Sequence, residues 1–379
     1  MRIRGARARD RGGHVRKRCS SIHLRLSLEW VCLLALAGGL RLSAAQSEKS
    51  EPAGPPAPRA QWIFTARIKG HLVLRGSPAG AFSPDSRSIA IISGHRVLLT
   101  GLNSKSQRRF LQPGVKGVID LEIQSASFVS PDRLLILAAG RIAKRPSYQT
   151  PLLAFLWSAS KDSAAGKAEE IATSGGFGPA VFFPRIGFLV IPKKNYFTLW
   201  NPVTGRVLGE KVPELTRPAQ VFDFSPNGQW LLLAQIEGNA FPDPVVVQLK
   251  GHRFVDILKG HTGPVTGMNF SRDSSKVVTA CTDGRARIYS APGWKLLATL
   301  SGHAGPVRWA EFSPDGRTVV SAGDDGTVRV WSAEDGQLLE TLTQPRSSVR
   351  TAAFSPNGEW IAATTDRYVY LWQKTHGGQ

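Results

Sequence analysis

The chain has 379 residues, of which 42% are hydrophobic and 38 are glycines. This composition is typical of a folded protein with many tight turns and argues against general disorder. The formal net charge is +20; residues 1–45 contribute +8 from ten Lys or Arg and two acids, so the remainder carries +12. Such a charge favours anionic partners, although a solvated basic surface explains it equally well. Outside residues 1–45 Cys281 stands alone, which excludes an internal disulfide framework there.

The N-terminal segment has the organisation of an export signal. Residues 1–29 are rich in arginine, and residues 30–40 form an apolar run of 11 residues, which is shorter than the roughly 20 that a bilayer span needs. Small residues at 43–45 then predict cleavage before Gln46. We therefore expect a signal peptide in residues 1–45 and a secreted or periplasmic protein. An uncleaved membrane anchor and a basic leader on a cytoplasmic protein remain as alternatives.

A proline-rich linker follows the predicted signal. Residues 46–60 contain four prolines among small and charged residues and offer nothing for a core. The globular domain is expected over residues 61–374, with a short C-terminal tail at residues 375–379.

An internal repeat determines the predicted architecture. A phenylalanine followed by a turn occurs seven times, at Phe82, Phe128, Phe183, Phe224, Phe270, Phe312 and Phe354. The successive spacings are 46, 55, 41, 46, 42 and 42 residues by subtraction. A period of about 40–45 residues with four strands per unit is typical of propeller blades. The sequence therefore predicts an all-β, single seven-bladed β-propeller, and the long second interval predicts an insertion around residues 140–178.

The sixth unit shows the expected strands of one blade. Residues 307–312 form an inner strand, and the Ser-Pro-Asp-Gly sequence at 313–316 favours a β-turn. Residues 318–322 and 327–331 follow as β-branched, alternating strands. Residues 337–342 form the outer strand, so that four antiparallel strands make up one blade.

The two ends of the globular part predict how the ring closes. Residues 62–68 resemble residues 294–300, an outer strand, whereas the chain ends on a third strand at residues 368–372. The last repeat therefore lacks only the strand that the N-terminal end supplies. We expect residues 62–68 to pair with residues 368–372, which would remove a sheet edge and fasten the ring.

These repeats resemble the WD-repeat family over about residues 61–373. The resemblance rests on the Gly-His pairs at Gly260-His261 and Gly302-His303 and on Tyr289, Trp331 and Trp372 at the ends of third strands. It implies a hydrogen-bonded set of four side chains in two blades: His261, Thr279, Asp283 and Tyr289 in blade five, and His303, Ser321, Asp325 and Trp331 in blade six. Blade seven keeps Asp366 and Trp372 but has Ala362 and no matching histidine.

The resemblance also implies a non-enzymatic scaffold that binds proteins through the narrow face of the ring. The residues that it places there stand at the starts of inner strands or just before the aspartate of the set: Thr266, Arg308, Arg350, Thr282, Asp324 and Thr365, with Trp309 beside Arg308. Arginine and tryptophan are enriched among interface hot spots. The expected partner is an unidentified protein, with an acidic one favoured by charge, bound by a monomeric propeller within an assembly. No cofactor or metal is expected.

Two other function classes fit the sequence less well. His303, Ser321 and Asp325 could form a hydrolase triad, but the set recurs at fixed repeat positions and no Gly-x-Ser-x-Gly elbow occurs. The histidines lack metal-binding spacing, so a lactonase-like propeller hydrolase is the weaker alternative. An intracellular adaptor for acidic partners or nucleic acid is the other. If the protein is exported, nucleic acid is not an expected partner. Contact with a membrane is then expected only through an uncleaved leader.

Overall fold

The structure is a computed structural model and describes residues 61–70, 81–102, 108–113, 118–142, 151–158, 168–173, 180–192, 196–211, 219–235, 244–250 and 253–375. The chain divides into two units, residues 1–57 and 58–379, and the second unit holds all of the described residues. The predicted signal, the linker and the end of the tail lie outside the described residues. No helix in the described ranges is long and apolar enough to cross a membrane.

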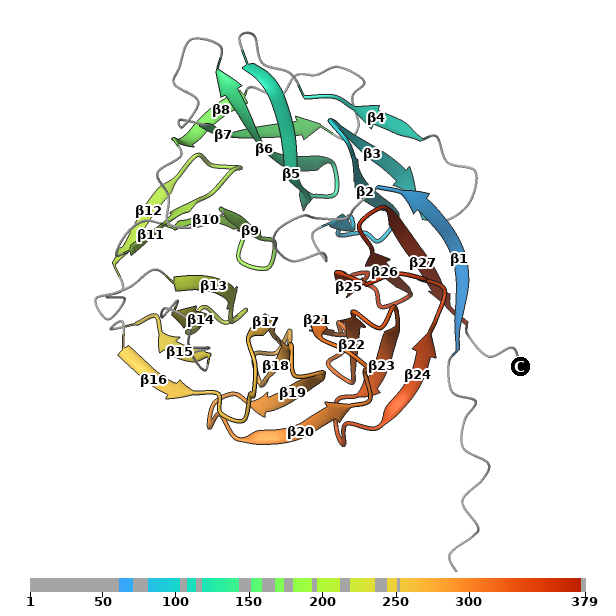
Figure 1. Ribbon diagram of the computed structural model, residues 1–379. Helices are drawn as coiled ribbons and strands as arrows, with labels where there is room; N and C mark the ends of the chain where they lie inside the picture. Colours follow the sequence, from blue (N-terminus) through green and yellow to red (C-terminus); the bar gives the residue numbers. More distant parts are fainter. Residues whose placement is uncertain are drawn as a thin grey trace, which may run out of the picture. The chain divides into compact units, whose positions relative to one another are not determined.

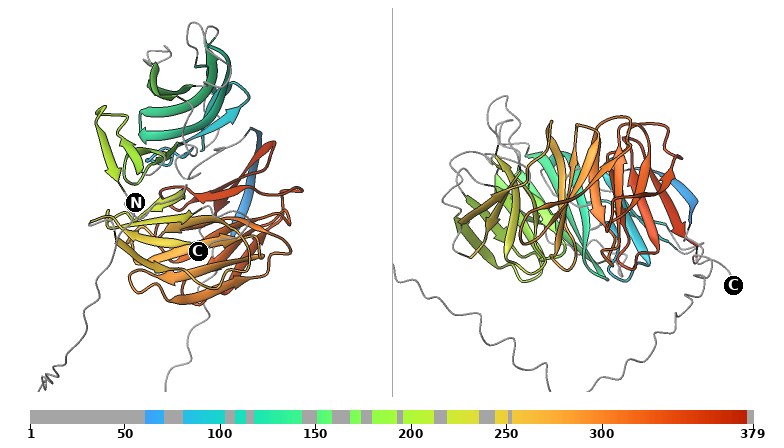
Figure 2. Two further views of the ribbon diagram at one scale, coloured as in Figure 1. Left: turned by 60° about the vertical axis from the view of Figure 1, so that its left-hand side comes forward. Right: turned by 90° about the horizontal axis from the view of Figure 1, so that it is seen from below.

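Seven small antiparallel sheets surround a central axis, so the predicted propeller is confirmed (Figure 1). Blades one to three contain β2 (Ser88–Ser93), β3 (Arg96–Gly101) and β4 (Arg109–Leu111); β5 (Val118–Ser130), β6 (Arg133–Ile142), β7 (Pro151–Ser158) and β8 (Ala168–Thr173); and β9 (Val181–Phe183), β10 (Phe188–Pro192), β11 (Tyr196–Trp200) and β12 (Val207–Lys211). Seen from below, the blades stand side by side around the axis (Figure 2).

The remaining four blades follow the same order from the axis outward. Blade four contains β13 (Ala219–Phe224), β14 (Trp230–Gln235), β15 (Val245–Gln248) and β16 (Arg253–Ile257). Blade five contains β17 (Val265–Phe270), β18 (Lys276–Cys281), β19 (Arg285–Ser290) and β20 (Leu296–Ser301). Blade six contains β21 (Val307–Phe312), β22 (Thr318–Gly323), β23 (Val328–Ser332) and β24 (Leu338–Leu342). Blade seven contains β25 (Thr351–Phe354), β26 (Trp360–Thr364), β27 (Tyr368–Lys374) and β1 (Trp62–Lys69).

The first strand closes the ring as predicted. β1 pairs antiparallel with β27 from Trp62 opposite Lys374 to Lys69 opposite Tyr368, with one irregularity between Phe64 and Ala66. The backbone amide of Trp62 also lies 3.3 Å from both carboxylate oxygens of Glu340 in β24. The N-terminal strand therefore connects the end of blade seven to the outer strand of blade six.

The repeated phenylalanines hold neighbouring blades together. All seven are buried, at the ends of the inner strands or, for Phe82, in a single bridge to Ile89. In the described residues the apolar core forms seven clusters, and each is shared by two adjacent blades. One of them joins Phe82 of blade one to Ala353 and Leu371 of blade seven. Because each contact repeats around the axis, apolar packing between the blades stabilises the ring.

The turns that follow the inner strands are stabilised by serine side chains. In blade six the Ser313 hydroxyl donates to Asp315 Oδ1 at 2.5 Å and accepts the Thr318 amide at 3.0 Å. Between blades, the Asn357 amide donates to Ser86 Oγ at 3.0 Å. These turns thus add polar contacts to the apolar closure of the ring.

The insertion predicted for the second interval falls at the end of β6, in β7 and β8 and in the segments that follow them. β5 and β6 of blade two are long, with 13 and 10 residues. Most of the predicted insertion lies outside the described residues.

Candidate functional site

The candidate residues gather at one face of the ring, the face at which inner strands begin and second strands end. We call it the loop face, because the loops that lead into the inner strands and the turns that join the second and third strands lie there. In blades five to seven these turns follow β18, β22 and β26. The antiparallel register places their polar residues beside the start of the next inner strand.

Blade six carries a continuous hydrogen-bonded set beneath this face. The Trp331 indole donates to Ser321 Oγ at 2.7 Å, and Ser321 Oγ lies 2.7 Å from His303 Nε2. His303 Nδ1 lies 3.0 Å from Asp325 Oδ2. The arrangement fits a neutral histidine that donates from Nδ1 and accepts the serine proton at Nε2. Burial lowers the pKa of His303 although Asp325 opposes the shift, so the neutral form prevails near pH 7.

Asp325 anchors the loop that enters blade six. Its carboxylate accepts the Ala304 amide at 3.0 Å and the Thr327 amide at 3.0 Å. Burial alone would raise its pKa, but the Ala304 amide, His303 and Thr327 together lower the pKa to about 2. Ser321 is fully buried and its oxygen is shared by Trp331 and His303. This geometry supports a structural role, since a hydrolytic serine must be reached by its substrate.

Blade five connects the equivalent residues differently. His261 Nε2 lies 2.8 Å from the Thr279 hydroxyl, while His261 Nδ1 lies 3.0 Å from the Leu258 carbonyl. The Tyr289 hydroxyl donates to the Lys259 carbonyl at 2.7 Å. The aromatic residue thus supports the entering loop directly.

The aspartate of blade five engages an arginine. Asp283 forms a two-pronged pair with Arg287, at 2.7 and 3.2 Å, and accepts the Thr262 amide at 3.1 Å. Burial would raise the pKa of Asp283, but Arg287 and the Thr262 amide lower it well below its usual range. In both blades one buried carboxylate therefore holds the entering loop by its amide.

In blade seven the strand register changes which residues correspond to the set. Val319 lies opposite Trp331 in blade six, and Ile361 lies opposite Trp372 in blade seven. Two residues further along the second strand, the counterpart of Ser321 is therefore Ala363 and not Ala362. The Trp372 indole donates to Gln344 Oε1 at 2.8 Å instead.

Asp366 is likewise not the counterpart of Asp325. Arg350 pairs with Asp366 just as Arg308 pairs with Asp324, in each case 16 residues along the chain. Asp366 therefore corresponds to Asp324, and the next residue, Arg367, stands where blade six has Asp325. The turn of blade seven is one residue shorter, so counting back from Trp372 places each earlier position one residue off.

The two arginines predicted for partner binding both form ion pairs at the loop face. Arg308 Nε lies 2.9 Å from each oxygen of Asp324, which also accepts the Ser348 hydroxyl. Arg350 Nε lies 2.9 Å from Asp366 Oδ1, and these two side chains are 47% and 69% exposed. Equivalent pairs thus stand on adjacent blades, and the pair on blade seven can be reached from solvent.

The other candidates differ in accessibility. The Thr266 hydroxyl donates to the Val307 carbonyl at 2.6 Å, and Thr282 is partly buried. Trp309 packs against the cluster between blades six and seven. Thr365 is only 2% exposed, because its hydroxyl turns inward to the Tyr368 carbonyl. The structure therefore places Thr365 beneath the loop face and not on it.

Sequence reasoning missed a polar cluster in the central channel. A cavity of about 450 Å³ at the opposite mouth is lined by the turns after the inner strands and by Arg185, Asp223 and Glu311. Arg185 lies 4.0 Å from Asp223 and 3.7 Å from Glu311, and it donates to the Phe270 carbonyl at 2.5 Å. A polar residue directly before the repeated phenylalanine was the available signal.

Burial dominates the electrostatics of this channel cluster. It raises the pKa of Asp223 to about 6 and that of Glu311 to about 7, while Arg185 partly opposes both shifts. Arg185 favours ionisation of both carboxyl groups, but burial outweighs it, and Asp223 further raises the pKa of Glu311. In the described part of the chain, no three His, Cys, Asp or Glu side chains come together to hold a metal ion.

Comparison with known proteins agrees with the blade boundaries at the C-terminal end. Residues 251–290, 294–332 and 336–373 each match the model of the WD domain, G-beta repeat. No curated protein matches the chain. The matched repeats run from β16 to β27 and include both Gly-His loops. The structure is thus a seven-bladed β-propeller in which residues 251–373 contain three consecutive WD repeats.

Proposed function

We propose that this protein is a non-enzymatic scaffold that binds a protein partner through the loop face of blades five to seven. The observation that carries the proposal is the equivalent placement of Arg308–Asp324 and Arg350–Asp366 on adjacent blades, with Trp309 beside the first pair. WD-repeat propellers typically serve as protein-interaction scaffolds. A paired arginine is held in place before a partner arrives, which lowers the entropy lost on binding.

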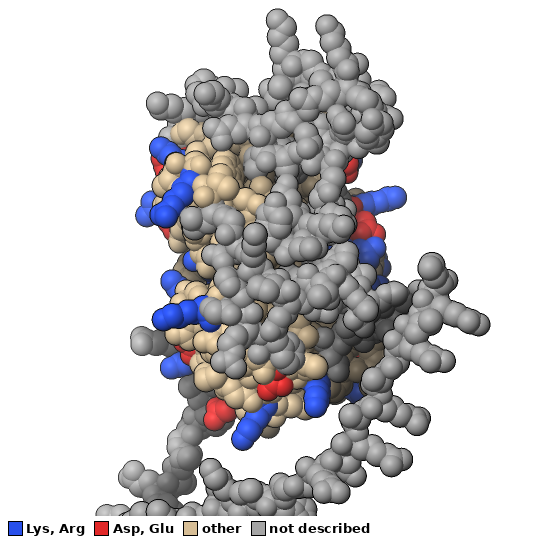
Figure 3. All heavy atoms as spheres, turned by 90° about the vertical axis from the view of Figure 1, so that its left-hand side faces the viewer, with Lys and Arg blue, Asp and Glu red and all other residues tan. Residues whose placement is uncertain are grey.

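The polar residues beneath this face support binding over chemistry. Ser321, His303 and Asp325 are joined by hydrogen bonds, and in blades five and six the aspartate of the set holds the entering loop. An acidic partner is favoured because residues outside 1–45 carry +12. On the side of the ring that Figure 3 shows, Lys and Arg side chains stand apart with acidic residues among them.

Charge reversal of the two arginines should disrupt the loop face. The double variant Arg308→Glu and Arg350→Glu is expected to weaken capture of the partner at least about tenfold. Each new glutamate would repel an acidic partner and would also be repelled by Asp324 or Asp366, so the ion pairs of the loop face are lost. The measurement is affinity capture with the purified protein, followed by titration of the protein recovered.

A matched control separates this effect from a general change of charge. Arg206 and Arg317 are exposed on turns at the opposite face, and changing both to Glu alters net charge equally. Capture should survive in the control. Equal loss in both double variants, or no loss in either, would contradict the proposed face.

We also propose that the protein is exported, on the strength of the N-terminal sequence. The mature protein is expected to begin at Gln46 and to be recovered from the secreted or periplasmic fraction. N-terminal peptide mass spectrometry of fractionated cells measures this directly. Recovery of intact Met1 from the soluble cytoplasm would instead support the intracellular adaptor, for which acidic proteins or nucleic acid are the partners.

A further inference from the structure

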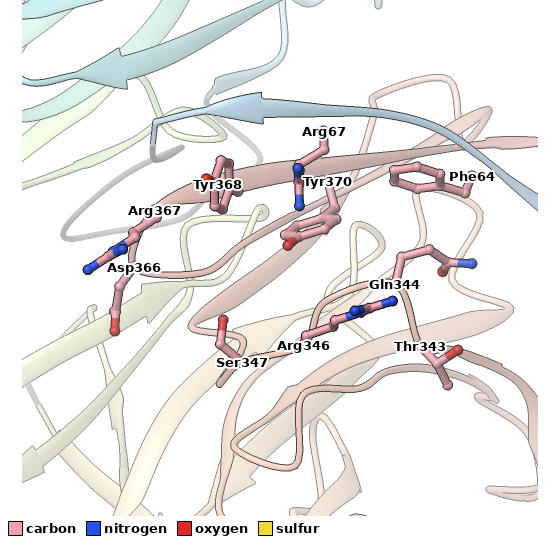
Figure 4. A pocket seen from close by; sticks show the side chains of 10 residues that line it. All are labelled: Phe64, Arg67, Thr343, Gln344, Arg346, Ser347, Asp366, Arg367, Tyr368 and Tyr370. Carbon is pink, nitrogen blue, oxygen red and sulfur yellow. The ribbon is translucent and has the colours of Figure 1, made fainter.

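A second site opens between blades six and seven. A cavity of about 930 Å³ lies between the loop after β24 on one wall and β1 with β27 on the other. Figure 4 shows Arg67 extending from β1 beside the rings of Tyr368 and Tyr370, with Arg346 on the loop opposite. Phe64 closes one end of the cavity, and Arg367 lies at the other beside Asp366. Its volume is within the range of ligand-binding pockets.

The cavity carries an excess of positive charge. In the described part of the chain, none of the three guanidinium groups of Arg67, Arg346 and Arg367 has a carboxylate partner. Arg67 instead lies over the Tyr368 ring at 4.6 Å. Asp366 also lines the cavity, but its carboxylate is bound by Arg350 at 2.9 Å. All three side chains are exposed, so their positive charge can be reached by an anion from solvent.

Comparison of the repeats identifies the missing anion. In blade six, Asp325 stands in the turn that joins the second and third strands, accepts the Ala304 amide and lies 3.8 Å from Arg329. We call this position the corner of a blade. In blade five, Asp283 takes the same place and pairs with Arg287 at 2.7 Å. Blade seven has Arg367 in the position of Asp325 and lacks the Gly-His pair in the entering loop. The corner that its sister blades fill with their own carboxylate is therefore open and basic.

We propose that this cavity binds an acidic segment of a partner protein, with a carboxylate of the partner taking the place that Asp325 occupies in blade six. The inference rests on the proposed scaffold function and names the chemistry of its partner. Arginine binds carboxylates through two parallel hydrogen bonds. The rings of Phe64, Tyr368 and Tyr370 suit an apolar or aromatic residue beside the acid. Aromatic rings with arginines thus favour a peptide over a bare anion.

Charge argues against a second copy and against residues 1–45 as the occupant. A second copy that begins at Gln46 carries +12, and residues 1–45 carry +8, so the three arginines would repel both. The cavity also joins segments distant in sequence, namely β1, β27 and residues 343–347. A ligand bound there bridges the two ends of the chain and should raise the melting temperature as well.

The test uses a fluorescein-labelled octapeptide that contains Asp, Glu and one Trp, and a matched peptide with Asn and Gln in place of the acids. Fluorescence anisotropy with the full chain should show binding of the acidic peptide only. Arg367→Asp, which restores a carboxylate at the corner, should weaken binding at least about tenfold. Arg317→Asp, the same change of charge on an exposed turn at the opposite face, should leave binding within about twofold.

Each outcome decides the matter. Equal binding of the two peptides would overturn the proposal, and so would equal weakening by Arg367→Asp and Arg317→Asp. The proposal is also wrong if phosphatidylserine vesicles or pyrophosphate bind in a way that depends on Arg367 while the acidic peptide does not bind. Melting curves confirm that both variants fold. If the peptide fails while partner capture still depends on Arg308 and Arg350, the cavity assignment is wrong and the scaffold function stands. If the peptide binds but partner capture does not depend on Arg308 and Arg350, the cavity assignment stands and the proposed role of the loop face is wrong.

Discussion

Deletion of residues 61–69, which removes β1, is expected to abolish the cooperative unfolding transition of the propeller or to lower its melting temperature by more than about 10 °C. Most side chains of β1 are themselves exposed or half-buried, so little of the loss comes from them. The larger cost is on β27, which becomes an open edge and exposes Trp372, Leu371 and Val369, all buried in the intact ring.

Calorimetry on the deletion and on a control that begins at Gln61 measures this effect. The control keeps every residue of β1 and its register with β27. It should unfold in a single transition like the full chain. A deletion variant with the same transition temperature as the control would show that β1 does not fasten the ring.

The variant Glu311→Gln is expected to become more stable than the unaltered protein as the pH rises from 5 to 8. Burial raises the pKa of Glu311 to about 7, above its ordinary value of 4.5. The folded state therefore binds the proton more tightly than the unfolded state, so the stabilisation from this group is complete below pH 4.5 and is lost as the pH rises toward 7. Glutamine resembles the neutral acid and removes the loss, which gives a gain of about 3 kcal/mol at pH 8.

Thermal denaturation of both proteins across this pH range provides the measurement. His303, whose lowered pKa changes stability in the opposite direction, is present in both and cancels in the difference. Glu334→Gln, an exposed residue on the turn after β23, serves as the control and should show no pH-dependent difference. A Glu311→Gln variant less stable than the unaltered protein at pH 8 would mean that its charge is needed by Arg185.

Local sequence determined the blades and their closure. Each repeated phenylalanine ends an inner strand and enters an interblade cluster, so apolar periodicity and turn residues were enough to place it. The likeness of residues 62–68 to the predicted outer strand at residues 294–300 also predicted the pairing with β27. These features follow from short stretches of chain, in which burial, turn conformation and strand propensity all favour the same structure.

The sites depend on residues that only the ring brings together. Asp223 and Glu311 lie two blades apart and share Arg185 of a third blade, an arrangement that no local pattern encodes. The role of Asp366 required the strand register, because one missing turn residue shifts every position beyond it. The arginine-lined cavity requires β1 beside β27, opposite the loop after β24. The sequence by itself thus determined the repeated unit and its closing strand, whereas the tertiary structure decided which charges meet, because closure around an axis places side chains far apart in the chain within a few ångströms.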